Sequence, residues 1–120
     1  MTASESSTAR IGNVLHPVTD VASAADFYGR AFGFATKFAD GDRYAALDGG
    51  SLTLALAGPA EDVTAGRAAV SIKVPDVRAT VEAVVEAGGS VVRSPEVGPH
   101  ELRAVVIDPW ENALVIYGPL

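Results

Sequence analysis

An internal repeat constrains the fold of this chain more than any other feature. The segment VTDV at residues 18–21 recurs fifty-six residues later as VPDV at residues 74–77. Each segment opens an amphipathic run that ends at glycine, Gly33 in the first copy and Gly89 in the second. Strand-like sequence precedes and follows each run. A repeat of this size indicates two copies of one supersecondary unit.

Hydrophobic periodicity predicts the order β-α-β-β-β in each copy. Asp20 and Asp76 are expected to cap the two helices, because a carboxylate accepts hydrogen bonds from the free amides of a first turn. In the first copy we expect a helix over 21–32 and strands over 11–18, 35–39, 43–48 and 51–57. In the second we expect a helix from residue 77 to the glycines at 88–89, strands over 68–74, 90–93, 102–107 and 113–117, and a loop over 94–99.

The length of 120 residues favours one domain. We expect a disordered tail over 1–9 and a single domain over 10–120. Within it, module 1 covers about 10–58, a linker covers 59–66, and module 2 covers about 67–120.

Composition excludes several classes of function. The net charge is −6 and the nine Lys and Arg residues are scattered, so nucleic acid is not an expected partner. The chain has no cysteine, which excludes disulfides, thiolate metal sites and cysteine nucleophiles. No signal peptide or membrane span is evident, and we expect a cytoplasmic protein that does not bind membranes.

A series of short motifs in order resembles the vicinal oxygen chelate superfamily, which includes glyoxalase I, extradiol dioxygenases and bleomycin-type resistance proteins. The matching segments, all read from the sequence, are Val18-x-Asp20, Phe27-Tyr28, Gly33-Phe34, Val74-x-Asp76-Val77, Gly88-Gly89 and Asp108-Pro109-x-x-Asn112. The resemblance implies an α+β fold in which two tandem βαβββ modules form a cup-shaped mixed sheet, with helices on its convex face. It also implies a small organic ligand in the cup and favours a homodimer. Whether the cup closes within one chain or across a dimer is left open.

Enzymes of this family usually hold a divalent metal through His and Glu side chains on four strands. The family spacing places these four positions at Asn13, at Thr53 or a neighbour, at Ala69 and at Val115. Methyl groups cannot coordinate a cation, and divalent metals prefer imidazole and carboxylate donors. We therefore expect neither a metal site of the family type nor another cofactor.

Strand alternation predicts which side chains face the concave side of the sheet. Leu52, Leu54 and Leu56 should instead pack under the helices. His16 should lie opposite Asn13, on the helix-covered face, although a one-residue bulge would turn it into the cup. The candidate ligand-binding residues are Asn13, Tyr44, Thr53, Ser71, Lys73, Arg103, Trp110 and Tyr117.

Three residues are candidates for acid–base chemistry: His100, Lys73 and Glu101. An imidazole suits proton transfer near neutral pH, which makes His100 a candidate general acid or base. For each of the three, a solvent-exposed structural role is the competing interpretation. Trp110 has two alternatives, a cleft cap or a dimer contact.

These observations give three functional hypotheses. The first is a metal-independent protein that binds a small organic molecule in the cup, of the sequestration or resistance type. The second is a metal-independent isomerase, lyase or cyclase of secondary metabolism that uses side-chain acid–base chemistry. The third, which the ligand positions make the weakest, is a metal-dependent glyoxalase- or dioxygenase-type enzyme with displaced ligands.

Overall fold

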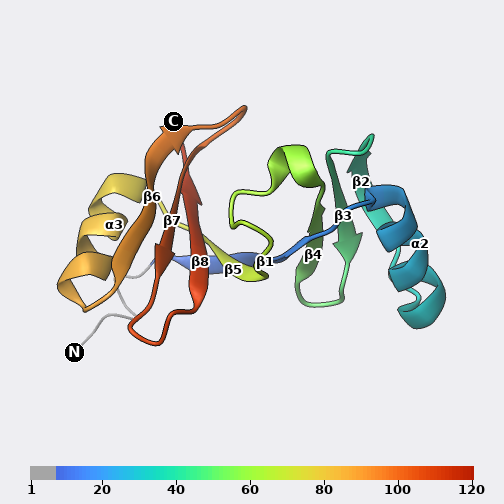
Figure 1. Ribbon diagram of the computed structural model, residues 1–120, viewed down its shortest axis with the longest axis horizontal. Helices are drawn as coiled ribbons and strands as arrows, with labels where there is room; N and C mark the ends of the chain where they lie inside the picture. The colour runs from blue at the N-terminus through green and yellow to red at the C-terminus, as the bar shows by residue number, and fades with distance from the viewer. Residues whose placement is uncertain (1–7) are drawn as a thin grey trace. The chain divides into compact units, whose positions relative to one another are not determined.

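Two βαβββ modules follow one another along the chain (Figure 1). The computed structural model describes residues 8–120, so most of the predicted tail lies outside the described residues. The first module contains β1 (Arg10–Pro17), α2 (Val21–Phe32), β2 (Thr36–Asp40), β3 (Tyr44–Asp48) and β4 (Thr53–Ala57). The second contains β5 (Ala69–Lys73), α3 (Val77–Glu86), β6 (Ser90–Val97), β7 (Leu102–Ile107) and β8 (Ala113–Gly118), and a short 3₁₀ helix, η1 (Pro59–Glu61), lies between the modules. The expected α+β fold is confirmed.

The chain forms two compact units whose boundaries fall inside β1 and β5. The first unit is Gly12–Val70, and the second combines residues 8–11 with Ser71–Leu120. In the first unit the strand order is β2-β3-β4-β1, with β1 parallel to β4 and the other pairs antiparallel. In the second it is β5-β8-β7-β6, and the pairs β7–β8 and β6–β7 are antiparallel.

Both helices begin at an aspartate cap, as predicted. A side-chain oxygen of Asp20 accepts a hydrogen bond from the backbone amide of Ser23 at 3.0 Å, and Asp76 accepts one from Ala79 at 3.0 Å. These bonds satisfy amides that have no partner within a first helical turn. Helix α2 ends at Gly33, whose φ of 75° lies in the left-handed region.

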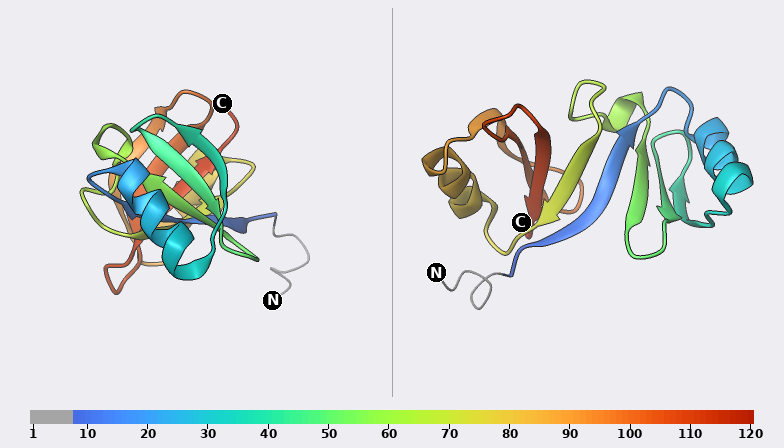
Figure 2. Two further views of the ribbon diagram at one scale, coloured as in Figure 1. Left: turned by 90° about the vertical axis from the view of Figure 1, so that its right-hand side faces the viewer. Right: turned by 90° about the horizontal axis from the view of Figure 1, so that it is seen from below.

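Each helix covers one face of its own sheet (Figure 2). In the first unit, Val21 of α2 packs with Leu47 and Leu56 of the sheet, and Leu54 adjoins this core. In the second unit the buried core is formed by Val74, Val77, Val81, Ala104, Val106 and Ile116. Burial of each large aliphatic side chain contributes about 1.5–3 kcal/mol, which makes these two cores the main stabilising features of the units.

Two expectations from the sequence are wrong. Strand β6 continues to Val97 instead of ending at Arg93, so much of the predicted loop over 94–99 is strand, and Glu96 pairs with Arg103 of β7. Leu52 precedes β4 and is 42% exposed, so it does not pack under a helix. Within residues 8–120, no helix is both long and apolar enough to cross a membrane.

Candidate functional site

In the first unit, the sheet face opposite α2 carries three of the predicted site residues. Asn13 of β1 pairs with Thr53 of β4, and Leu15 pairs with Ala55 two residues further along, so these four side chains share one face. Tyr44 of β3 pairs with Ala57 of β4 and therefore points to the same side.

Asn13 has a buried hydrogen-bond acceptor. Its Oδ1 atom is inaccessible to solvent and has no hydrogen-bond partner within the described part of the chain. A buried acceptor without a donor costs free energy that a donor from a bound molecule or water would recover. Asn13 is therefore a polar contact point on an otherwise apolar strand face.

Lys37 joins this face although the sequence analysis did not identify it. Its Nζ atom donates a hydrogen bond to Oγ1 of Thr53 at 2.5 Å. Thr36 of β2 pairs with Leu47 of the helix-covered face, so alternation places Lys37 on the opposite face, and the register shift between Thr36 and Phe38 puts Phe38 on that face as well. The ring of Phe38 lies 6.3 Å from the ring of Tyr44, so two aromatic rings adjoin the polar group.

His16 lies on the other face of β1, under α2, as the alternation predicts. Its Nδ1 atom and the hydroxyl of Tyr28 are 3.4 Å apart and form a long hydrogen bond, whose direction depends on the tautomer of the ring. The two rings also contact each other, with centroids 6.3 Å apart. This local partner gives His16 a structural role in the first unit.

In the second unit, the face opposite α3 carries Ser71, Lys73, Arg103 and Tyr117. Arg103 of β7 pairs with Tyr117 of β8. The backbone amide of Val74 donates to the carbonyl oxygen of Tyr117 at 2.9 Å, which places Lys73, the last residue of β5, beside Tyr117. Ser71 is buried and Lys73 is exposed.

Tyr117 lies in a charged environment. Its pKa is raised above the ordinary value mainly by burial and further by the negative charge of Glu101, whereas the positive charge of Arg10 opposes this change. Glu101 and His100 lie in the turn between β6 and β7, which is closed by a hydrogen bond of 2.7 Å from the amide of Gly98 to the carbonyl of Glu101. Glu101 is half-buried and His100 is exposed.

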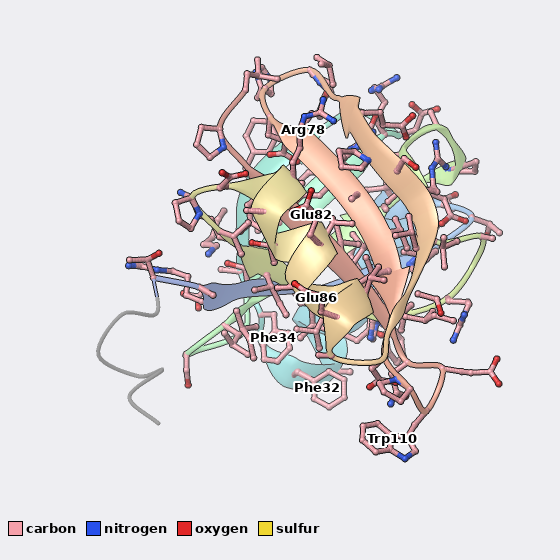
Figure 3. All side chains as sticks on the ribbon, turned by 90° about the vertical axis from the view of Figure 1, so that its left-hand side faces the viewer. Phe32, Phe34, Arg78, Glu82, Glu86 and Trp110 are labelled. Atoms are coloured by element: carbon pink, nitrogen blue, oxygen red, sulfur yellow. The ribbon has the colours of Figure 1, made fainter. Side chains whose placement is uncertain are left out.

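Trp110 lies in the turn between β7 and β8 and projects into solvent (Figure 3). Its side chain is 79% exposed, and Asp108 holds the turn by accepting hydrogen bonds from the backbone amides of Trp110 and Asn112 at 2.9 Å. These bonds and one from the side chain of Asn112, the largest contributor, lower the pKa of Asp108.

Comparison with known proteins identifies the family. The profile of the Glyoxalase/Bleomycin resistance protein/Dioxygenase superfamily matches residues 10–116. The chain belongs to this superfamily. It is also 46% identical over 94 residues to an uncharacterized protein of Mycolicibacterium smegmatis, a match that covers 78% of this chain and 80% of that protein.

Solved structures of the superfamily share the fold at low identity. A superfamily member from Vibrio splendidus is 18% identical, with a TM-score of 0.70, and the match covers 92% of this chain and 99% of that one. A methylmalonyl-CoA epimerase of Streptomyces coelicolor, in complex with 2-nitronate-propionyl-CoA, is also 18% identical, with a TM-score of 0.68, 92% of this chain and 96% of that chain covered. At this identity the similarity concerns the fold.

The residues at the superfamily's four metal positions do not fit a divalent cation. By the superfamily's spacing they are an amide at Asn13, a hydroxyl at Thr53 or the side chain of a neighbour that is neither His nor Glu, a methyl group at Ala69 and an isopropyl group at Val115. Ala69 and Val115 are buried strand residues without donor atoms in their side chains. Within residues 8–120, no cluster of three or more His, Asp or Glu side chains offers an alternative site.

Proposed function

We propose that this superfamily member binds a small organic molecule without the family's divalent metal, and that it acts by holding its ligand, as sequestering proteins do. The observation that carries the proposal is the donor set at the four metal positions. Asn13 and Thr53 offer only neutral oxygens, and Ala69 and Val115 offer none. A metal-assisted reaction of the family type has no ligands there.

The first unit supports the binding of an organic molecule. Asn13, Thr53 and Lys37 provide polar groups on a sheet face that also carries the rings of Phe38 and Tyr44. An apolar and aromatic surface with a few fixed polar groups is the usual composition of a small-molecule site. The buried Oδ1 atom of Asn13 favours a ligand that donates a hydrogen bond, such as a hydroxyl or an amide.

Metal analysis tests the first part of the proposal. The purified full chain is incubated with Zn²⁺, Ni²⁺, Mn²⁺ or Fe²⁺, dialysed, and analysed by plasma mass spectrometry. We expect metal far below one equivalent per chain. A metal that remains at one equivalent, and is lost when Asn13 or Thr53 is replaced, would contradict the proposal.

Ligand binding is tested with a thermal-shift panel of flavonoids, naphthoquinones and anthraquinones, because a ligand that binds the native state raises the Tm. We expect the variant Asn13→Leu to keep or raise the Tm of the free protein, because it removes an unsatisfied acceptor, and to lose much of the ligand-induced increase. Thr36→Ala is the matched control, since Thr36 is exposed and pairs with Leu47, whose side chain lies in the helix-covered core. Equal ligand-induced increases in wild type and Asn13→Leu would exclude Asn13 from the site.

Metal-independent catalysis is the second candidate. It is supported by Tyr117, which lies beside Lys73 on one sheet face and whose pKa is raised by burial and by the nearby carboxylate of Glu101. A Lys73→Ala or His100→Ala variant that binds a ligand but no longer converts it would establish catalysis. Retained conversion in both variants would remove these residues from the mechanism.

Self-association and location complete the proposal. Phe27, Phe32 and Trp110 are large apolar side chains that are more than half exposed, which supports a homodimer in solution. Light scattering after size exclusion tests the dimer, and a monomer at all concentrations would contradict it.

A cytoplasmic location stays a prediction from the sequence.

A further inference from the structure

A hollow of about 310 Å³ lies in the second unit, where β5 ends and β1 begins. It is lined by Thr8, Arg10, Lys73, Val74, Pro75 and Pro119. The hydrogen bond from the amide of Val74 to Tyr117 fixes the end of β5 against β8, and Pro75 then redirects the chain. The two cationic residues of the lining lie at the ends of ordered strands: Arg10 is the first residue of β1 and Lys73 is the last residue of β5.

The described lining of this hollow is positively charged, in contrast to the acidic chain as a whole. Arg10 and Lys73 are both exposed, and no Asp or Glu side chain lies among the described residues that line it. Within residues 8–120, ion pairs are formed by Arg30, Arg43 and Arg93 among others, and no ion pair is found for Arg10 or Lys73. The chain as a whole has a net charge of −6, so these two cations form a local positive region on an acidic protein.

Two like charges on one hollow repel each other, and a bound anion relieves that repulsion. A guanidinium group offers a planar fork of donors that matches carboxylate and phosphate oxygens, and an ammonium group adds a compact charge. The hydroxyl of Thr8 is a further donor on the same wall, while Pro75 and Pro119 provide apolar surface beside the cations.

From this arrangement we propose that the hollow is an anion site, in which Arg10 and Lys73 bind the oxyanion end of a small organic molecule, either a phosphate or a carboxylate. Pro75 and Pro119 would contact the carbon atoms next to that group. Tyr117, which responds to the charge of Arg10, lies beside the hollow and is a candidate to contact the ligand. None of the four metal positions is among the described residues that line this site, which extends the function proposed above.

Nuclear magnetic resonance of the ¹⁵N-labelled full chain tests this proposal with two probes, inorganic phosphate and benzoate, each at an ionic strength fixed with chloride. We expect saturable shifts at the amides of Thr8, Lys73 and Val74. Each of the variants Arg10→Gln and Lys73→Gln should weaken binding about tenfold, because each removes a charge-assisted hydrogen bond. Preference for phosphate indicates a phosphorylated ligand, and preference for benzoate indicates an aromatic carboxylate.

Arg78→Gln is the matched control. Arg78 lies on the outer surface of α3 with Glu82 and Glu86, and its replacement changes the net charge of the chain by the same amount (Figure 3). The spectrum of each variant also reports whether the chain is folded. Shifts no larger than those given by chloride, or equal weakening by Arg78→Gln and Arg10→Gln, would overturn the anion site. If the chain binds an aromatic probe of the thermal-shift panel but neither anion, the anion site is wrong and the proposed function still stands.

Discussion

In both modules, the valine directly after the helix-capping aspartate packs against a glycine at the end of a strand. A Cβ atom added to Gly58 would lie 3.2 Å from Cγ2 of Val21, and one added to Gly118 would lie 3.2 Å from Cγ2 of Val77. Each would also overlap a backbone carbonyl oxygen. The repeat thus preserves a close approach of this glycine to a backbone carbonyl, that of Asp42 in the first module and that of Val74 in the second, which only glycine allows.

The modules differ on their remaining surfaces. The outer part of α2 carries aromatic rings, including Phe27 and Phe32, whereas α3 presents Arg78, Glu82 and Glu86 to solvent (Figure 3). On the opposite side, the sheet of the first unit presents Asn13 and Thr53 with one cation, Lys37, whereas that of the second presents Lys73 and Arg103 beside Tyr117. The two copies have kept their packing and diverged where side chains can meet other molecules, so the repeat predicts the fold and not the chemistry.

Core truncation gives the largest effect and tests whether the two copies are equally important for stability. Leu56→Ala and Ile116→Ala each remove a fully buried aliphatic side chain, 0% and 1% exposed, from the equivalent position of one core. We expect each to lower the free energy of unfolding by about 2–5 kcal/mol, measured by urea denaturation.

Leu52→Ala is the control for this pair, because Leu52 is exposed and its loss should change stability little. A small change for either core variant would mean that one module depends on its packing much less than the other.

The sequence predicted most elements because local signals and the repeat agreed. Asp20, Asp76 and Gly33 fixed the helix boundaries, and the expected α2 and β7 match the structure. The end of β6 was predicted too early, at residue 93 instead of 97, because Pro95 and Gly98 are typical of loops. Proline is tolerated there because β6 is an edge strand and its register shifts between Arg93 and Glu96.

The candidate site was harder to predict because it depends on long-range geometry. Alternation correctly placed Asn13 and Thr53 on one sheet face of the first unit, and Lys73 and Tyr117 on one sheet face of the second. Lys37 was missed because its contact with Thr53 joins β2 to β4 across β3, and this strand order does not follow from periodicity within one segment. The hollow at Arg10 was missed because it joins residues at opposite ends of the chain, Thr8 and Pro119.

Removal of either helix cap should lower the free energy of unfolding by less than core truncation does, and it tests whether the two modules depend equally on their caps. Asp20→Ala and Asp76→Ala each remove one side-chain hydrogen bond to a first-turn amide, so each should lower the urea midpoint, though by less than the core variants. Asn replacements are the controls, because asparagine caps about as well as aspartate. An Asn variant as unstable as the Ala variant would show that the negative charge, and not the hydrogen bond, stabilises the helix.

The cap of α2 also has a pH dependence. The backbone amide of Ser23 holds the pKa of Asp20 below its ordinary value of 3.8, so the folded state binds its proton less readily than the unfolded state. This contribution to stability is present above that ordinary value and is lost as the pH falls through the lowered pKa. Because asparagine caps about as well as ionised aspartate, wild type and Asp20→Asn should have similar stability at neutral pH, and the wild type should become the less stable of the two in acid. Parallel stability curves would contradict the lowered pKa.

Titration of Tyr117 gives the smallest effect on stability and tests the charged surface of the second unit. Burial, with help from Glu101, raises the pKa of Tyr117 above 10.0, and Arg10 opposes the increase. The folded state therefore retains the phenolic proton, and the resulting stability is present below pH 10.0 and lost as the pH rises through the raised pKa. Absorbance of the phenolate, with Tyr117→Phe as the reference, should give a higher pKa in Arg10→Gln and a lower one in Glu101→Gln. Glu86→Gln, on the outer surface of α3, should leave this pKa unchanged; if it lowers the pKa as much as Glu101→Gln does, net charge and not the local arrangement around Tyr117 controls the titration.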